Sequence, residues 1–199
     1  MTGAIILAAG ASTRMGQPKQ LLDIHGTSLL QKAISAFAGA RIDSIAVVLG
    51  YSHYHFRETV KSETADVIVN DDWQRGMGSS IKTGLRHLLE QKPDLDNVVI
   101  AVCDQPYLDS DLIESLLQTH DETGKPITAS FYAGMPGVPA LFDKSYFEKI
   151  SSIADDVGAK KLIVENPSDV VLVPFPGGDV DLDTMEDYLN FIRNKENGS

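Results

Sequence analysis

Short apolar runs alternate with helix-like segments along the first 120 residues of this chain. The apolar runs cover residues 4–9, 45–49, 67–69 and 98–102. The helix-like segments that follow them cover residues 28–37, 52–62, 79–91 and 109–120. A short continuous apolar run is typical of a strand buried on both faces of a sheet. This rhythm of strand and helix restricts the first half of the chain to a parallel sheet covered by helices.

The second half of the chain is less regular. Strands are expected at residues 126–132, 139–142 and 170–173, and helices at residues 145–151, 158–165 and 184–194. We predict an α/β fold, a doubly wound and Rossmann-like sheet that is mostly parallel and has helices on both faces. Because no repeat or linker divides the chain, we expect a single domain over residues 1–193 and a flexible polar tail at residues 194–199.

The charge of the chain limits the partners that suit it. Its formal net charge of −11 disfavours binding to the phosphate backbones of nucleic acids. A small anionic ligand then requires basic side chains gathered in one place. No apolar stretch approaches the roughly 20 residues of a membrane helix, and the N-terminus lacks the basic region of a signal peptide. We therefore expect a cytoplasmic protein without nucleic-acid or membrane partners.

The segment after the first apolar run combines small residues with two basic ones. Residues 7–19 read LAAGASTRMGQPK. Ligands of open α/β sheets bind beyond the carboxyl ends of strands, where small residues let backbone N–H groups approach phosphate oxygens. Arg14 and Lys19 add positive charge there. The spacing fits neither G-x-x-x-x-G-K-[ST] nor G-x-G-x-x-G. The alternative is a glycine-containing turn with two solvated basic side chains.

This segment resembles the signature L-A-A-G-x-S-x-R-M-G-x-x-K of the MobA-like NTP transferases, and within them the molybdenum cofactor cytidylyltransferases. The matching positions are Leu7, Ala8, Ala9, Gly10, Ser12, Arg14, Met15, Gly16 and Lys19. The resemblance implies that this loop binds the triphosphate of a nucleotide, and that Arg14 and Lys19 stabilise the phosphates during transfer. The guanylyltransferase branch typically has two glycines where this chain has Ala9 and Gly10, so the resemblance favours CTP over GTP.

Asp104 begins a D-Q-P triplet at the end of the fourth apolar run. A carboxylate at this strand end points toward the same crevice as residues 7–19, and a hard oxygen ligand suits Mg²⁺. A turn or capping aspartate is the alternative. The triplet resembles the family motif whose aspartate binds Mg²⁺, so Asp104 is a predicted catalytic residue and metal ligand. Cys103, at the end of the buried strand, is expected to pack in the core.

Gly76 begins the sequence GMGSSIKTG, which opens a predicted helix. Helix N-termini favour anions, and serine hydroxyls there can pair with the edge of a base. The alternative is that glycine and serine merely start the helix. The sequence resembles the family segment G-x-x-x-S-[LI]-x-x-G, which contacts the nucleotide base. On this match Ser80 is the predicted base contact, Gly76 shapes the turn, and Trp73 is expected to anchor a loop near the pocket.

Asp181 and Asp183 lie in the acidic sequence GDVDLDTMEDY at residues 178–188. Clustered carboxylates repel one another, and a metal ion is one way to tolerate them. Acidic loops that simply face water are the usual alternative. The sequence resembles the family motif D-[IV]-D-T-P-E-D-Y, with Met185 in place of proline, whose first aspartates lie near the metal and the acceptor. We predict Asp183 as the second metal carboxylate beside Asp104, with Asp181 as its rival.

Val138, Pro139 and Lys160 are expected on the side of the second substrate. The sequence PGVPALF matches the family stretch G-H-P-x-L-F in part, because Val138 stands where cytidylyltransferases commonly have histidine. The sequence GAKKL resembles the family segment G-A-[KR]-x-[LI], which implies that Lys160 holds an acceptor phosphate. An exposed helix lysine is the alternative for Lys160.

The resemblance implies a Mg²⁺-dependent nucleotidyltransferase that moves CMP from CTP onto the molybdenum-molybdopterin cofactor and releases pyrophosphate. Contact with a molybdoenzyme or its chaperone belongs to the same expectation. Because Val138 departs from the family pattern, a sugar or alcohol phosphate as acceptor, or GTP as donor, stays open. A non-catalytic nucleotide-binding protein or cofactor chaperone is the alternative of another class. Plain binding does not require Arg14, Lys19 and Asp104 together, which argues against it.

Overall fold

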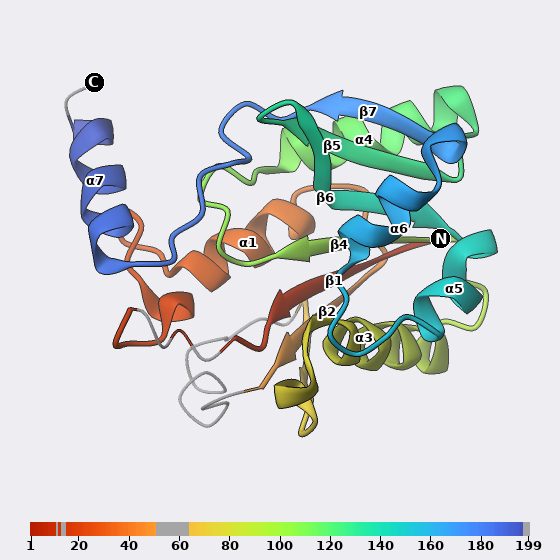
Figure 1. Ribbon diagram of the computed structural model, residues 1–199, viewed down its shortest axis with the longest axis horizontal. Coiled ribbons are helices and arrows are strands. Elements are labelled where there is room, and N and C mark those ends of the chain that lie inside the picture. The colour runs from red at the N-terminus through yellow and green to blue at the C-terminus, as the bar shows by residue number, and fades with distance from the viewer. Residues whose placement is uncertain (11, 13–14, 51–63, 197–199) are drawn as a thin grey trace.

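The computed structural model describes residues 1–10, 12, 15–50 and 64–196. Within these residues, seven strands form one sheet in the order β3-β2-β1-β4-β6-β5-β7 (Figure 1). The strands are β1 (Thr2–Ala8), β2 (Ser44–Leu49), β3 (Asp66–Val69), β4 (Asn97–Val102), β5 (Ile127–Tyr132), β6 (Met135–Asp143) and β7 (Val170–Pro174). Strand β6 runs antiparallel to β4 and β5, and the other neighbours pair in parallel. The sheet is mostly parallel, as predicted.

Helices cover both faces of this sheet. They are α1 (Leu29–Ala38), α3 (Met77–Gln91), α4 (Ser110–Thr123), α5 (Phe147–Ser151), α6 (Ala159–Glu165) and α7 (Met185–Glu196), with short 3-10 helices η1 (Lys19–Leu21), η2 (Trp73–Arg75), η3 (Lys144–Tyr146) and η4 (Pro167–Asp169). Side chains of α1 and α4 enter one apolar core, and those of α3, α5 and α6 enter the other. The predicted doubly wound α/β architecture is therefore confirmed. No helix among the described residues has the length and apolar character needed to cross a membrane.

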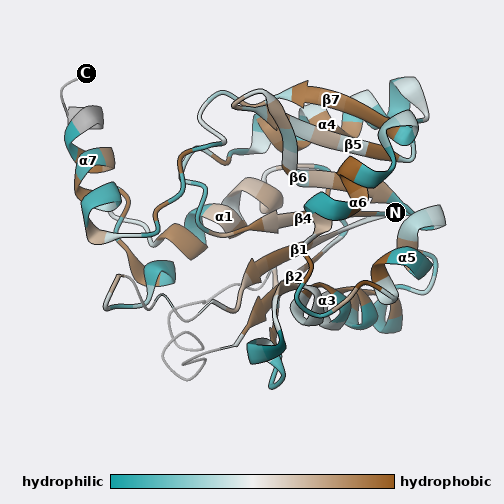
Figure 2. Cartoon of the chain, viewed as in Figure 1, coloured by the Kyte–Doolittle hydropathy of each residue, from teal (hydrophilic) through white to brown (hydrophobic). Residues whose placement is uncertain are grey.

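The two apolar cores follow directly from the sequence pattern. Figure 2 shows the apolar residues concentrated along the strands, with polar residues on the outer sides of the helices. Helix α1 begins where the Ser28 side chain accepts a hydrogen bond from the backbone N–H of Gln31 at 3.1 Å. Helix α4, predicted over residues 109–120, begins where the Asp109 side chain accepts from the N–H of Leu112 at 2.9 Å. It ends at Gly124, whose φ of 61° is the left-handed conformation of a helix C-cap.

Two elements differ from those predicted from the sequence, and a third predicted element lies outside the described residues. Strand β6 begins at Met135 rather than at residue 139, because it forms a hairpin with β5 through Gly134, whose φ is 76°. Helix α7 continues to Glu196, into the segment 194–199 that was expected to be a polar tail. The helix expected at residues 52–62 lies outside the described residues.

Strands β1 and β4 are neighbours, and this pairing positions the site. Leu7 of β1 lies opposite Val102 of β4. One residue further on, the N–H of Cys103 donates to the carbonyl of Leu7 at 3.1 Å. Because parallel strands end at the same edge of the sheet, the loop after β1 and the D-Q-P triplet after β4 meet there.

Candidate functional site

A cavity of about 320 Å³ opens at the carboxyl ends of β1 and β4. The predicted nucleotide and metal residues that line it are Leu7, Ala8, Ala9, Gly10, Lys19, Gly76, Ser80 and Asp104. Trp73 lines it as well, in agreement with its predicted place near the pocket. The cavity thus joins the loop after β1, the end of β4 and the start of α3, and its volume is that of a small-molecule site.

Ser12 and Gln20 brace the loop after β1 from within. The Ser12 hydroxyl oxygen accepts a hydrogen bond from the backbone N–H of Lys19 at 3.1 Å. The side-chain amide of Gln20, which is 1% exposed, donates to the carbonyls of Ala8 at 2.9 Å and Gly10 at 3.1 Å. The curved loop is therefore held in shape by its own residues. Ser12 serves this internal bracing and does not line the cavity, and Arg14 lies outside the described residues.

Lys19 joins two carboxylates that are far apart in the sequence. Its ammonium group lies 2.5 Å from Oδ2 of Asp104 and 2.9 Å from Oδ1 of Asp183. Burial by itself lowers the pKa of Lys19, but the charge and hydrogen bond of Asp104, followed by the bond to Asp183, raise it above the ordinary value. Lys19 therefore stays protonated and contributes a fixed positive charge at the wall of the cavity.

Asp104 also has an oxygen that fits a metal ligand. Its Oδ1 is buried and has no hydrogen-bond partner among the described residues. Buried carboxylate oxygens are nearly always paired, and hard oxygen atoms suit Mg²⁺. The described residues contain no group of three or more His, Cys, Asp or Glu side chains arranged to hold a metal. A metal at Asp104 and Asp183 would therefore complete its coordination with phosphate oxygens and water, as Mg²⁺ commonly does.

Asp181 lies at the rim of this charged cluster. The backbone N–H of Leu182 donates to the carbonyl of Asp104 at 3.2 Å, which holds the acidic segment beside the end of β4. Leu182 is fully buried and packs with Phe191 of α7, so the last helix fixes this segment. Partial desolvation, followed by the negative charges of Asp104 and Asp183, raises the pKa of Asp181 to about 6.

The shift at Asp181 makes stability depend on pH. Because its folded pKa lies above the unfolded value, the folded state holds the proton more tightly, and stability falls as the pH rises from about 4 to about 6. Asp181→Asn is expected to stabilise the metal-free protein at pH 7 by up to about 1 kcal/mol after solvent screening, and by less at pH 4. Urea unfolding in EDTA at both pH values measures this, with the exposed Asp94→Asn as control. Equal differences at the two pH values would contradict the assignment.

Ser80 is fixed at the start of α3 by a buried asparagine. The Asn70 side-chain amide donates to the hydroxyl oxygens of Ser79 at 2.8 Å and Ser80 at 2.9 Å. Both serines are buried, but of the two only Ser80 lines the cavity at the ends of β1 and β4. Asn70 thus sets the direction in which the Ser80 hydroxyl hydrogen can donate.

The turn into α3 requires glycine, and two N–H groups at the start of the helix already have a partner. Gly76 has a φ of 122°, which side chains rarely tolerate, so it shapes the turn as predicted. The N–H groups of Gly78 and Ser79 donate to the carbonyl of Asp155 at 2.8 and 3.3 Å. The expectation that helix N–H groups bind an anion here is therefore wrong for these two, because a distant loop already occupies them.

The residues expected on the acceptor side fall into two groups. The Gln105 amide, which is 3% exposed, donates to the carbonyl of Val138 at 3.1 Å and to that of Gly178 at 2.9 Å. Val138 and the buried Pro139 are thus tied to the residue that follows Asp104. Lys160 is exposed at the start of α6 and does not line the cavity. The structure therefore brings Val138 toward the cavity, whereas Lys160 is an exposed residue of α6 outside the cavity lining.

Gln20, Asn70 and Gln105 are the site residues that sequence reasoning missed. Each is a buried side-chain amide that holds a motif loop in place. Gln20 follows the signature lysine and Gln105 is the middle residue of the D-Q-P triplet, so a signal existed for these two. Cys103 is buried as expected, and burial raises the pKa of its thiol to about 12, which argues against a nucleophilic role.

Proteins of known structure or curated sequence resemble this chain. The bifunctional protein GlmU of Bifidobacterium adolescentis is 36% identical over 132 residues, which is 64% of this chain but only 28% of that protein's length. The purine catabolism protein PucB of Bacillus subtilis is 28% identical over 196 residues and 92% of both chains. The crystal structure of Rv0371c from Mycobacterium tuberculosis superposes with a TM-score of 0.84 at 26% identity and covers 96% of this chain and 97% of that one. Rv0371c has also been solved as a complex with manganese.

A protein-family model also matches most of the chain. The MobA-like NTP transferase domain matches residues 4–170, which include the loop after β1, the start of α3 and the D-Q-P triplet. The acidic segment at residues 178–188 lies beyond the matched region, although the structure places it beside Asp104. The chain belongs to the MobA-like NTP transferase family.

Proposed function

We propose that this protein transfers a nucleoside monophosphate from a nucleoside triphosphate to a phosphate-bearing acceptor and releases pyrophosphate. The observation that carries the proposal is the cavity at the end of β1 and β4, where Lys19, Asp104 and the small-residue loop face one space. A half-buried cation can neutralise an anionic substrate, and the half-buried carboxylate beside it can bind the metal ion that accompanies that substrate. Family membership agrees with this chemistry.

In this reaction the protein positions the two substrates and neutralises their charge, and no covalent intermediate with the protein forms. A phosphate oxygen of the acceptor attacks the α-phosphorus of the nucleotide, the new P–O bond forms, and the bond to the β-phosphate oxygen breaks. The backbone of residues 7–10 lies along the triphosphate, and Lys19 neutralises the charge that develops on the departing pyrophosphate. Arg14 is proposed for the same task from the sequence signature.

Asp104 and Asp183 are the proposed Mg²⁺ ligands. Their carboxylates lie on either side of the Lys19 ammonium, and Asp104 has the unpaired buried oxygen. When Mg²⁺ is bound, it supplies positive charge that neutralises the phosphates, in addition to the charge of the protein's own side chains. Asp181 is the proposed rival ligand, since it lies close enough to both carboxylates for their charges to raise its pKa.

CTP is the proposed donor and the molybdenum-molybdopterin cofactor the proposed acceptor. Ala9, where guanylyltransferases typically have glycine, supports CTP, and Val138 and Pro139 lie beside the site where a second substrate would approach. Lys160 is proposed to hold an acceptor phosphate from α6, and a molybdoenzyme or its chaperone is the proposed protein partner. A sugar or alcohol phosphate acceptor remains the second candidate, because Val138 replaces the usual histidine.

An assay of pyrophosphate release tests the proposal. The protein is supplied with Mg²⁺, each of the four NTPs, and acceptors that include molybdopterin, sugar phosphates and alcohol phosphates. We expect turnover with CTP and the molybdenum-bearing cofactor. Turnover with a sugar phosphate alone would overturn the acceptor assignment. Nucleotide binding without turnover on any acceptor would favour a non-catalytic binding protein.

Ser80→Ala is expected to raise the KM for the nucleotide about three- to tenfold with little change in kcat. The lost hydroxyl contributes one hydrogen bond to binding in both the ground state and the transition state. Steady-state kinetics with CTP measure the effect. Ser115→Ala is the control, because this exposed serine donates to the carbonyl of Asp111 within α4 and does not line the cavity. Similar KM values for the wild type and Ser80→Ala would show that Ser80 does not contact the nucleotide base.

A further inference from the structure

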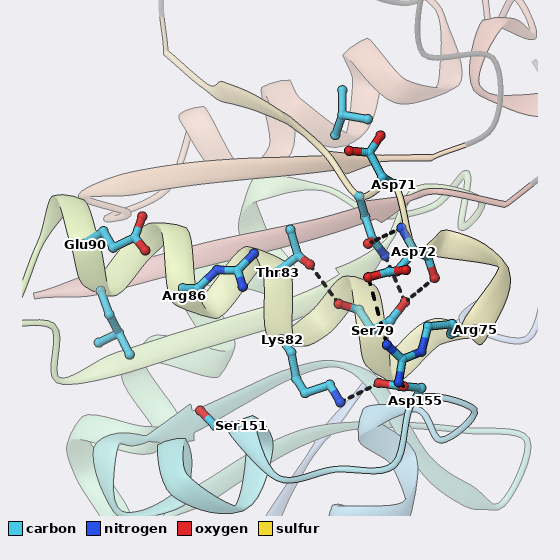
Figure 3. Close-up of a pocket in the computed structure, with 13 residues that line it drawn as sticks. Asp71, Asp72, Arg75, Ser79, Lys82, Thr83, Arg86, Glu90, Ser151 and Asp155 are labelled. Carbon is cyan, nitrogen blue, oxygen red and sulfur yellow. Dashed lines mark hydrogen bonds and ion pairs between the residues drawn. The ribbon is translucent and has the colours of Figure 1, made fainter.

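A second and larger groove runs along the outer side of α3. Its volume is about 730 Å³, and it contains none of the residues predicted to bind nucleotide or metal. The first turn of α3 separates it from the nucleotide cavity, since Ser79 lines the groove and Ser80 lines the cavity. Figure 3 shows Asp155 at the edge of this groove, joined to Lys82 and to Arg75. No motif in the sequence pointed to Asp155.

The backbone of Asp155 caps the helix that forms one wall of the nucleotide cavity. Its carbonyl oxygen accepts hydrogen bonds from the N–H groups of Gly78 at 2.8 Å and Ser79 at 3.3 Å. The first N–H groups of a helix have no partner within the helix itself. A residue 77 positions further along the chain than Gly78 therefore completes the first turn of α3.

The side chain of Asp155 connects two elements that carry cavity residues. One carboxylate oxygen lies 2.5 Å from the Lys82 ammonium on α3, and the other lies 2.5 Å from the guanidinium of Arg75 on η2. Lys82 also donates to the carbonyl of Ile153 at 3.0 Å, which fastens the same loop a second time. The Asp155 side chain is 20% exposed, so these contacts are partly shielded from water.

The loop and the helix start are packed too closely to move independently. A Cβ atom on Gly76 would lie 2.5 Å from the carbonyl oxygen of Asp155, and one on Gly78 would lie 2.8 Å from that of Val157. A Cβ atom on Gly158 would lie 2.9 Å from the sulfur of Met77. The glycines at positions 76 and 78 permit a close contact with the backbone of this loop that a larger residue would prevent.

The elements that Asp155 holds carry one side of the nucleotide cavity. Trp73 lies on η2 with Arg75, Gly76 makes the turn, and Ser80 lies on α3 two residues before Lys82. We propose that Asp155 is a positioning residue for nucleotide binding, which fixes this wall from the outside without touching the nucleotide. The inference rests on the proposed function of the cavity. Loss of the two ion pairs would free η2 and the first turn of α3. Nucleotide binding would then have to order this wall of the cavity, which lowers the affinity for the nucleotide.

Asp155→Asn and Asp156→Asn form the matched pair that tests this role. Asp156 is the exposed neighbour in the same loop, so its substitution removes the same charge without removing these ion pairs. This control matters because losing a negative charge near an anionic ligand would strengthen binding by long-range attraction. Trp73 is the only tryptophan in the chain and lines the cavity, so its fluorescence reports binding of CTP with Mg²⁺.

For Asp155→Asn we expect the Kd and KM for the nucleotide to rise roughly tenfold while kcat changes little, and for Asp156→Asn we expect no rise. Asp155→Glu is expected to recover part of the loss. If wild type and Asp156→Asn bind CTP and Asp155→Asn binds it equally well, the positioning role is overturned. If the wild type binds no nucleotide, the proposed function itself fails. If thermal unfolding shows that Asp155→Asn is not folded, Arg75→Gln replaces it, with Arg86→Gln as the control that removes the same charge from the same groove without removing an ion pair of Asp155. Arg75 is 62% exposed, so we expect KM to rise two- to threefold above that of Arg86→Gln. A KM of folded Arg75→Gln equal to that of Arg86→Gln would then overturn the role.

Discussion

Lys19→Met is expected to lower kcat/KM for nucleotidyl transfer on the order of 10² to 10³-fold. The methionine has a similar length but no charge, so the developing charge on the leaving pyrophosphate loses its preorganised cation. The same change leaves the carboxylates of Asp104 and Asp183 facing each other without the ammonium between them. We therefore also expect a lower melting temperature in EDTA, part of which Mg²⁺ restores. Pyrophosphate release and thermal unfolding measure the two effects.

Lys161→Met is the control for loss of a lysine, because that side chain is 54% exposed on α6. It is expected to keep wild-type activity. Lys19→Arg keeps the charge but changes the shape, and we expect an intermediate loss. Activity of Lys19→Met within a factor of three of wild type would show that Lys19 only pairs with carboxylates.

Asp104→Asn is expected to lower kcat about 100-fold and to raise the Mg²⁺ concentration for half-maximal activity about tenfold. Asparagine preserves the size of the side chain but removes the charge that a hard cation requires. Because Asp183 still pairs with Lys19 in this variant, the fold around the cavity should persist. A titration of pyrophosphate release with Mg²⁺ measures both values.

Asp94→Asn is the control for Asp104→Asn, since Asp94 is exposed and lies away from the cavity. It should leave the Mg²⁺ dependence of the wild type unchanged. If Asp104→Asn lowered kcat but left the Mg²⁺ concentration for half-maximal activity unchanged, Asp104 would be a partner of Lys19 rather than a metal ligand. That result would assign the metal to the acidic segment alone.

The parts of the fold that local chemistry determines could be predicted from the sequence. Apolar runs such as residues 98–102 predicted the buried strands, and the helix-like segment at residues 109–120 predicted α4. The direction of β6 could not be predicted, because it depends on a two-residue hairpin and on pairing with both β4 and β5. Such pairing is a property of the assembled sheet rather than of any one segment.

The candidate site was predictable in its residues and less so in its contacts. Motifs identified Lys19, Asp104 and Asp183 separately, but the ion pairs through the Lys19 ammonium appear only when three distant segments meet. Asn70 and Asp155 could not be predicted for the same reason. Nothing local to Asn70 or Asp155 reveals burial or partners, because both depend on the packing of β3 or of the loop before α6 against α3.

We propose that the cavity between the β1 loop and α3 binds a nucleoside triphosphate whose metal ion is held by Asp104 and Asp183. Crystals grown with CTP and Mn²⁺ test it most directly, because Mn²⁺ gives an anomalous signal where Mg²⁺ does not. We expect one peak about 2.2 Å from carboxylate oxygens of both aspartates, with phosphates along residues 7–10. A metal peak elsewhere, or a nucleotide bound outside this cavity, would contradict the account.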